Sequence, residues 1–522
     1  MGNDNPYLPQ VWYTIPRLLS LFDNNPLSDT YGMGDRFRWA WKLIDFGNGT
    51  FQGAAHGLAR LVVNGMLPEG LSEESVLRRI ESIFRGAEAL RYPNGSMAEA
   101  FPFESSFCVT ALVAYDLLNA CALLESRIDS AQHTRFLEVV RPLIGFLHKS
   151  DETHAFISNH LATAAAALYR WSAATGEAGE RRGREFLSRI LDNQSKEGWF
   201  KEYEGADPGY QSLCLYYLAD LHLLRPDLDI LDALRRSVKF LRYFVHPDGS
   251  FGGYYGCRNT RFYFPAGIEL LAKEIPEAAA MAVCMRRSIS RNTTVTLAAM
   301  DEPNLIPMFN AYCWAASISG DDIRDIENNL AEVPSMTTTA FRKYFPEAGI
   351  LIDKGQHHYT VVSLHKGGVC YHFHLNDKAK RIDCGAVAKD DKGRLYSTQA
   401  FNAANRIRFH DDTVEVTAAF TKIHGEIPTP LQFLVLRLLN LTLMRIDTIC
   451  SLVKKMLVKL LITGKKKAST SNKRTIRFGD DLAISDEWVN HKGKFSRLAV
   501  DTPFSVIHMA SQGYWQRQDD MQ

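Results

Sequence analysis

Apolar segments of helix length recur through the first 325 residues, and this recurrence restricts the fold more than any other feature of the chain. Three of the turns between them resemble one another, and their glycines, Gly95, Gly198 and Gly249, lie 103 and 51 residues apart. A period of about 50 residues fits one helical hairpin per unit, with an unmarked unit between the first two turns. We therefore predict a ring or arc of hairpins, with apolar inner helices whose N-termini line one mouth. The segments fall at 72–88, 104–125, 131–148, 156–175, 180–193, 209–224, 228–245, 263–273 and 305–318, and the turns read "YPNGSMAE", "SKEGWFKEY" and "HPDGSFGGY".

After about residue 335 the pattern changes from helical to extended. The stretch "HHYTVVSLHKGGVCYHFHL" at 357–375 alternates, is rich in β-branched and aromatic residues, and carries "KGG" as a turn. The stretches "RIRFHDDTVEVTAAF" and "FSRLAVDTPFSVIHMAS" continue the same style. We therefore predict a helical domain over residues 1–330, followed by an antiparallel β-sandwich over 331–522.

An apolar and basic insertion at about 428–467 interrupts the predicted sandwich. It carries no uncharged run of the roughly 18 to 20 residues that span a bilayer. Two interpretations stay open. One is strands, or a helical hairpin packed on the sandwich; the other is a basic amphipathic helix that makes peripheral contact with an anionic membrane face. Its basic residues include Arg437, Arg445, Lys454, Lys455 and Lys459.

Composition narrows the class of protein further. A formal net charge of +1 argues against a nucleic-acid partner, which would call for a strong basic excess. Nine scattered cysteines without a CxxC pair indicate reduced, buried thiols. The N-terminal stretch lacks the pattern of a signal peptide, so we expect a cytoplasmic protein, with the inner membrane face as its site of any peripheral contact. The oligomeric state stays open.

Polar residues open several helices that otherwise look buried. Asn159 and His160 stand in the first turn of the segment 156–175, and Tyr210 and Gln211 stand at the same point one period later. Glu104 opens an earlier segment in the same way. If the repeat forms a ring, these side chains converge on one opening. Tyr254 and Arg258 follow the third marked turn and would join them.

These motifs together resemble the heparinase II/III-like polysaccharide lyases. The matching pieces are "SNHL" at 158–161, "DPGYQ" at 207–211, "HPDGSFGGYYGCRNT" at 246–260 and the opening of the β-rich part, "HHYTVVSLHKGG". The resemblance implies an incomplete (α/α) toroid of helical hairpins followed by an antiparallel β-sandwich. It also implies catalytic roles for Asn159, His160 and Tyr210.

The resemblance further implies a histidine from the early β-domain, either His357 or His358. We take His358 as the catalytic candidate and His357 as a substrate-binding one, beside Glu104, Gln211, Tyr254 and Arg258. No cofactor is required. Some members of the family bind a structural metal in the sandwich, but the histidines here show no clear ligand spacing; they are His365, His372, His374 and His410.

The chemistry of a uronate lyase explains these residue types. The enzyme removes the C5 proton beside a carboxylate and expels the C4 oxygen, so it must first neutralise that carboxylate. Asn159, Gln211, Arg258 or a protonated His160 can do so. Tyr210 as phenolate, or neutral His160, can then act as base. The predicted function is a lyase that acts on an acidic oligo- or polysaccharide by β-elimination.

Three other functions stay open at this stage. A uronate C5-epimerase, or another modifier of a lipid-linked acidic glycan in surface polysaccharide synthesis, would use the same first step. A non-catalytic glycan-binding protein could retain the fold. A terpene cyclase toroid also carries such turns, but the acidic stretch nearest to a metal motif, "PDLDILD" at 226–232, lies in a connector and mid-helix.

Overall fold

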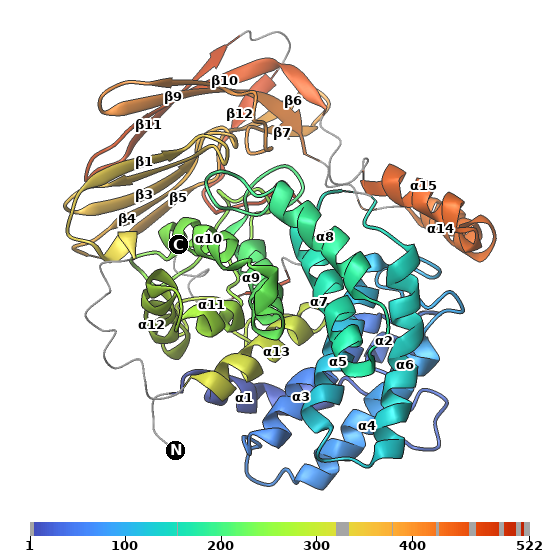
Figure 1. Cartoon of the computed structure of the whole chain (residues 1–522). Helices are drawn as coiled ribbons and strands as arrows, with labels where there is room; N and C mark the ends of the chain where they lie inside the picture. Colours follow the sequence, from blue (N-terminus) through green and yellow to red (C-terminus); the bar gives the residue numbers. More distant parts are fainter. Residues whose placement is uncertain are drawn as a thin grey trace.

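The computed structural model describes residues 5–153, 155–319, 333–377, 379–423, 427, 429–458, 466–489, 495–507 and 513–515. Helices are the regular elements of the described chain up to residue 318, and strands are the main regular elements from residue 341 (Figure 1). The helices are α1 Tyr7–Leu19, α2 Arg36–Trp39, α3 Ala54–Val63, α4 Glu73–Leu90, α5 Phe107–Leu124, α6 Ser130–Lys149, α7 Ser158–Thr175, α8 Glu180–Asp192, α9 Pro208–Leu224, α10 Leu231–Leu241, α11 Pro265–Leu271, α12 Pro276–Ser290, α13 Glu302–Ile318, α14 Pro430–Leu441 and α15 Asp447–Val458.

An inner ring of helices is the centre of the helical part. Helices α3, α5, α7, α9, α11 and α13 each pack against the next, and α13 packs back against α3. Most residues of these helices are buried, whereas the outer helices, such as α8 and α10, bury one face. The helical toroid predicted from the repeat is therefore confirmed, and its inner ring is closed.

The marked turns occupy equivalent places in the toroid. Each one leads from an outer helix into the next inner helix, and Gly95, Gly198 and Gly249 all have positive φ, at 89°, 104° and 85°. A Cβ on Gly95 would overlap the carbonyl oxygen of Pro142 in α6, and one on Gly198 would overlap that of Arg236 in α10. Only glycine fits this conformation and this close approach to the following outer helix.

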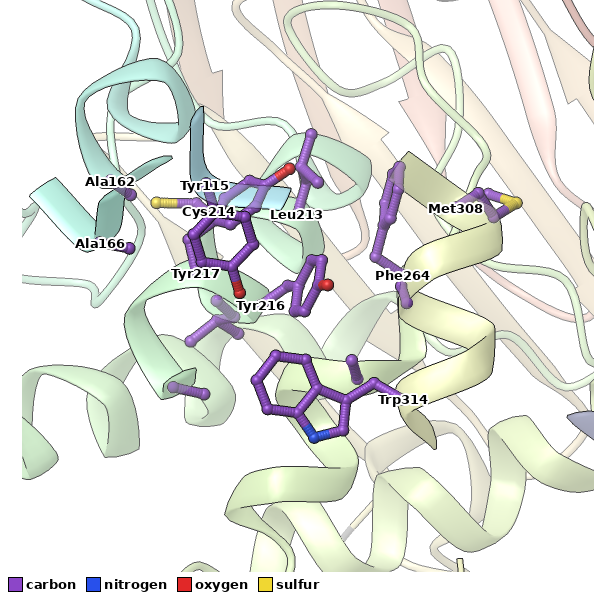
Figure 2. Packing of buried hydrophobic residues seen from close by; sticks show 14 of the residues in the cluster. Tyr115, Ala162, Ala166, Leu213, Cys214, Tyr216, Tyr217, Phe264, Met308 and Trp314 are labelled. Atoms are coloured by element: carbon purple, nitrogen blue, oxygen red, sulfur yellow. The ribbon is translucent and has the colours of Figure 1, made fainter. Parts of the chain in front are cut away.

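Aromatic side chains fill the middle of the ring. Tyr216 and Tyr217 stack with ring centroids 4.9 Å apart, and Tyr115 meets Tyr217 edge-on at 5.0 Å (Figure 2). Buried side chains therefore fill the middle of the ring. Among the described helices, α5 alone is both long and apolar enough to cross a membrane, and 78% of it is buried in this ring. All nine cysteines are free thiols, as predicted.

Two antiparallel sheets form the second part of the molecule, which confirms the predicted β-sandwich. One sheet has the order β1-β2-β3-β4-β5; the other has the order β11-β10-β9-β7-β6-β12, with β8 paired to β9. The strands are β1 Phe341–Phe345, β2 Ile350–Lys354, β3 His358–Ser363, β4 Val369–His374, β5 Lys380–Asp383, β6 Val387–Asp390, β7 Leu395–Ser397, β8 Arg406–Phe409, β9 Thr413–Lys422, β10 Lys467–Arg477, β11 Ala483–Val489 and β12 Phe495–Leu498.

The first sheet has one face toward the toroid. Tyr359, Val361 and Tyr371 belong to the same buried cluster as the inner helices, whereas Val362 and Cys370 pack between the two sheets. This alternation is the period of two that a strand imposes on its side chains. The sandwich is therefore joined to the toroid by a continuous apolar interface.

The insertion is a helical hairpin, α14–α15, in its described residues 429–458. It protrudes at the edge of the molecule, away from the sheets (Figure 1). Its contacts are with the toroid: Arg437 pairs with Asp45 at 2.9 Å, and the Cys450 thiol donates to the carbonyl oxygen of Phe103 at 3.3 Å. Of the structures we considered for the insertion, the helical hairpin is therefore confirmed and the strands are not. We expected the hairpin to pack on the sandwich, but these contacts place it on the toroid.

Candidate active site

The polar start of α7 is held by a carboxylate from another part of the chain. Glu202 accepts from the backbone N–H of Asn159 at 3.0 Å, and both of its oxygens lie 3.0 Å from Asn159 Nδ2. Ser158 donates through its backbone and its hydroxyl to the carbonyl of Lys201. Glu202 thus caps a helix N-terminus that has no side-chain cap of its own, and it fixes the orientation of the Asn159 amide.

His160 is paired with a second buried carboxylate. Its Nδ1 lies 2.5 Å from Glu152 Oε2, and the side chain of Glu152 is 4% exposed whereas that of His160 is 16% exposed. A carboxylate on one ring nitrogen fixes the orientation of the imidazole and stabilises its protonated form. The imidazole is therefore held at the edge of the site with partial access to solvent.

Tyr210 and Arg258 share a third carboxylate, that of Asp207. Asp207 accepts from the backbone N–H of Tyr210 at 3.2 Å and from that of Arg258 at 2.9 Å. The Arg258 guanidinium lies 3.7 Å from the ring centroid of Tyr203, the residue that follows Glu202. Tyr210 is half-buried in the first turn of α9, beside α7, with its ring edge-on to Phe262. Glu202, Tyr203 and Asp207 therefore link the starts of α7 and α9 to the loop of Arg258. That the side chains of Asn159, His160, Tyr210 and Arg258 share one mouth stays a prediction.

A lysine of the sandwich fixes the loop that carries Arg258. The ammonium of Lys366, in the turn between β3 and β4, donates to the carbonyls of Tyr254 and Gly256 and to the side chain of Asn259. Burial lowers the pKa of Lys366 to about 8. The second domain thus contributes to the site by holding one of its loops in place.

Burial also changes the charge of Glu202. Desolvation raises the pKa of this carboxyl to about 8, although the hydrogen bonds from Asn159 lower it. Glu202 therefore carries a proton at neutral pH for most of the time. A protonated Glu202 adds no negative charge to a mouth that would receive an anion.

Two predicted substrate-binding residues have structural roles instead. Gln211 is fully buried; its amide accepts from the N–H of Phe200 and donates to Ser237 of α10. Adjacent helix residues point about 100° apart, so Gln211 cannot share the direction of Tyr210. Glu104 closes its own loop by accepting from the N–H groups of Glu99 and Ala100. Both predictions are corrected.

The predicted histidines of the β-domain also lie elsewhere. His358 Nε2 is 2.8 Å from Asp353 and its Nδ1 is 3.2 Å from Asp480, both within the sandwich. It occupies the face of β3 opposite Tyr359, which faces the toroid. His357 is exposed just before β3. From His358 to Ser363 the strand extends about 17 Å, and the turn that contacts the site follows its far end. Neither histidine joins the site.

Tyr254 is half-buried, and its backbone N–H donates to the hydroxyl of Tyr371 in β4, so the sandwich also holds this part of the loop.

The sequence interpretation missed Glu152, Glu202 and Lys366. The signal for Glu202 was present: a carboxylate in the connector "KEYEGADPGYQ", directly before the start of α9. Lys366 acts through a contact between distant segments, which no local pattern reveals, whereas Glu152 stands only eight residues before His160, in the connector to α7.

His372 of the sandwich has partners other than a metal. His372 Nδ1 lies 2.8 Å from the hydroxyl of Thr360, and its Nε2 lies 3.0 Å from the carbonyl oxygen of Asp480. In the part of the chain that the structure describes, no three histidine, cysteine or acidic side chains are placed to hold a metal ion. The residues present in the sandwich therefore do not fit a structural metal.

No family model matches this sequence, and no curated protein is similar to it. Among solved structures, the chain is similar to a Paenibacillus xanthan lyase (12% identity, TM-score 0.48, 81% of this chain and 46% of that one). It is also similar to the chondroitin AC lyase of Streptomyces coelicolor A3 (12%, 0.49, 81% and 68%) and to heparinase III (11%, 0.41, 95% and 79%). The chain thus spans less than half the length of the xanthan lyase. At 11–12% identity these likenesses concern the fold alone.

Proposed function

We propose that this chain is a polysaccharide lyase that cleaves a uronic acid-containing glycan by β-elimination. The observation that supports the proposal is the set of polar contacts at the starts of the neighbouring helices α7 and α9: Glu202 holds the Asn159 amide, Glu152 pairs with the His160 imidazole, and Asp207 accepts from the backbone N–H groups of Tyr210 and Arg258. Amide and guanidinium donors suit a carboxylate. A phenol and an imidazole suit proton transfer.

The first step is neutralisation of the substrate carboxylate. The C5 proton of a uronate is a poor acid, because the carboxylate next to it is already negative. Donors from Asn159 and Arg258 would bind that carboxylate and stabilise the enediolate that forms when the proton leaves. The N-terminus of α7 adds partial positive charge. Protonated Glu202 orients the amide without repelling the anion.

The second step is proton transfer and elimination. Tyr210, as phenolate, takes the C5 proton; the electrons of that C–H bond form the C4=C5 double bond, and the C4–O bond breaks. The departing oxygen takes the proton back from Tyr210. His160, protonated and paired with Glu152, contributes positive charge to the mouth. The scheme uses only side chains of this chain.

The proposal is tested by incubating the chain with a panel of acidic glycans in heavy water. The first substrates to try are xanthan and chondroitin, the glycans after which two of the structurally similar lyases are named. A lyase gives a product with the ultraviolet absorbance of an unsaturated uronate. Solvent deuterium at C5 without that absorbance would indicate a C5-epimerase instead. If no uronate-containing glycan gives either signal, the proposal is wrong.

A further inference from the structure

The hairpin α14–α15 has an apolar face turned to solvent. In α14, Leu431, Leu434, Val435 and Leu438 are 50–69% exposed, and their spacing places them on one side of the helix. Asn440, on the side toward the protein, is buried. A surface helix of a globular protein normally shows the reverse order. Further exposed apolar side chains of the hairpin are Phe433, Leu441, Leu443, Ile446, Leu452 and Met456.

This face is fixed in direction, because the hairpin is attached to the toroid at several points. Besides the Arg437–Asp45 pair and the Cys450 contact, the Arg445 guanidinium lies 4.8 Å from the ring centroid of Phe103. Phe103 stands shortly before the N-terminus of α5, and the N-termini of the inner helices line the mouth of the toroid. The hairpin therefore sits beside the mouth and holds its apolar side outward.

A second exposed patch lies next to the hairpin. Asp45, the partner of Arg437, ends a segment that consists of the short helix α2 and the residues after it. We call this segment, residues 36–45, the aromatic loop. In it Phe37, Trp41 and Leu43 are 61%, 65% and 71% exposed. Tryptophan is enriched where proteins meet the boundary between lipid and water. Two separate segments of the chain thus present apolar side chains in the same region.

The positive charge of the hairpin segment indicates what kind of partner covers its apolar face. Residues 428–467 contain eight lysines and arginines and a single acidic residue, Asp447, whereas the whole chain has a formal net charge of only +1. Two copies of so basic a segment would repel each other, which disfavours self-association through it. An anionic lipid surface satisfies both the apolar face and the positive charge. With 12 residues, α14 is about 18 Å long, too short to cross a bilayer core of about 30 Å.

We propose that the hairpin and the aromatic loop form a surface that lies on an anionic membrane. The apolar side chains of α14 enter the boundary between headgroups and acyl chains, and exposed lysines such as Lys455 and Lys466 contact the headgroups, whereas Arg437 and Arg445 attach the hairpin to the toroid. This attaches the chain peripherally, with the mouth of the toroid beside the lipid.

The test is co-sedimentation of the full chain with vesicles of phosphatidylcholine, either alone or mixed with phosphatidylglycerol. We expect strong binding to the mixed vesicles and much weaker binding to phosphatidylcholine alone or at high salt. The double variant Leu434→Ser/Leu438→Ser should bind the mixed vesicles about tenfold more weakly or worse. The matched control is Leu27→Ser, at a leucine that is 92% exposed elsewhere. Lys455→Glu should weaken binding about tenfold, and Lys392→Glu, on an exposed loop of the sandwich, should leave binding unchanged.

Circular dichroism and thermal unfolding of each variant show whether it is folded; the substituted side chains are exposed, so we expect no change. The inference is overturned if the wild type ignores mixed vesicles, or if the Leu434/Leu438 variant binds as well as the Leu27 variant. It is also overturned if light scattering shows a dimer that only the Leu434/Leu438 variant loses, since the face would then bind a second copy. The assay needs no turnover, so its failure is distinct from failure of the proposed lyase activity.

Discussion

Individual residues explain why the helix α7 opens with polar side chains. Asn159 does not cap the helix itself; Glu202 caps it from another segment and holds the Asn159 amide as well. The repeat predicted that Asn159, His160 and Tyr210 would share a mouth, because a fixed period places equivalent residues at equivalent points of a ring. The repeat could not predict Glu202 or Glu152, whose roles depend on contacts between segments.

Glu202 gives a pH-dependent signature. Its pKa is about 8 in the folded chain, above the ordinary value, so the folded state keeps a proton that the unfolded state loses. Its contribution to stability is fully present below the ordinary glutamate pKa and is lost as pH rises to about 8. Glu202→Gln should therefore become more stable than the wild type by an increasing margin from pH 5 to pH 8. Denaturant unfolding across this range measures the margin, and parallel curves would refute the assignment.

Glu152 is expected to act through His160. Replacing it by glutamine removes the negative charge beside Nδ1, so a protonated imidazole at His160 would lose its ion-pair partner. If protonated His160 serves the reaction, the high-pH limb of the pH–rate profile should then move to lower pH. Lower activity with an unmoved profile would mean that Glu152 only supports the local fold. Glu185→Gln, at a surface ion pair of α8, is the control and should leave the profile unchanged.

At the scale of elements, helix starts position the site. The turns before the inner helices repeat, so the sequence predicted which helix ends face the mouth, and the structure confirms that organisation. Directions within an element were harder to predict. Gln211 was chosen for its position beside Tyr210, but one step along a helix turns the side chain toward α10. His358 was chosen on the resemblance alone, and the alternation of β3 turns it away from the toroid.

Asp207 links the start of α9 to the loop of Arg258. Asp207→Ala should cost about 1 to 2 kcal/mol through the lost cap alone, and it should also lower activity, because Tyr210 and Arg258 lose their common partner. Asp129→Ala removes a similar cap, from α6, away from the site. Both variants should melt at lower temperature in calorimetry, but only Asp207→Ala should lose turnover. Equal activity in the two would contradict the proposed link.

At the scale of the whole molecule, the sandwich supports the loop of Arg258 through Lys366, whereas His358 has its partners within the sandwich. Composition and pattern predicted two parts, but not how they join, because an interface depends on the shapes of both surfaces. Lys366 and Lys380 both cross it: Lys366 reaches the loop of Arg258, and Lys380 pairs with Asp248 at 3.3 Å. Variants of these two lysines can therefore distinguish two effects of the interface: support for the loop of Arg258 and stabilisation of the contact between the two domains.

Lys366→Met and Lys380→Met should both lower the melting temperature, the first more strongly, because it leaves buried oxygens without a donor. Only Lys366→Met should reduce turnover, since only that lysine orders the loop of Arg258. Calorimetry and initial rates on the same preparations check this. A loss of turnover in Lys380→Met as large as that in Lys366→Met would contradict the specific role of Lys366.

The most direct test of the proposed chemistry is the rate of unsaturated product formed by Tyr210→Phe, compared with Tyr13→Phe, on the glycan that the wild type cleaves. Tyr13 is exposed on α1, so its hydroxyl serves as the matched control. If the Tyr210 phenol moves the proton, its loss should reduce turnover by a factor of roughly 10² to 10⁴, with Tyr13→Phe unchanged. A Tyr210→Phe variant that still turns over at the wild-type rate would contradict the account.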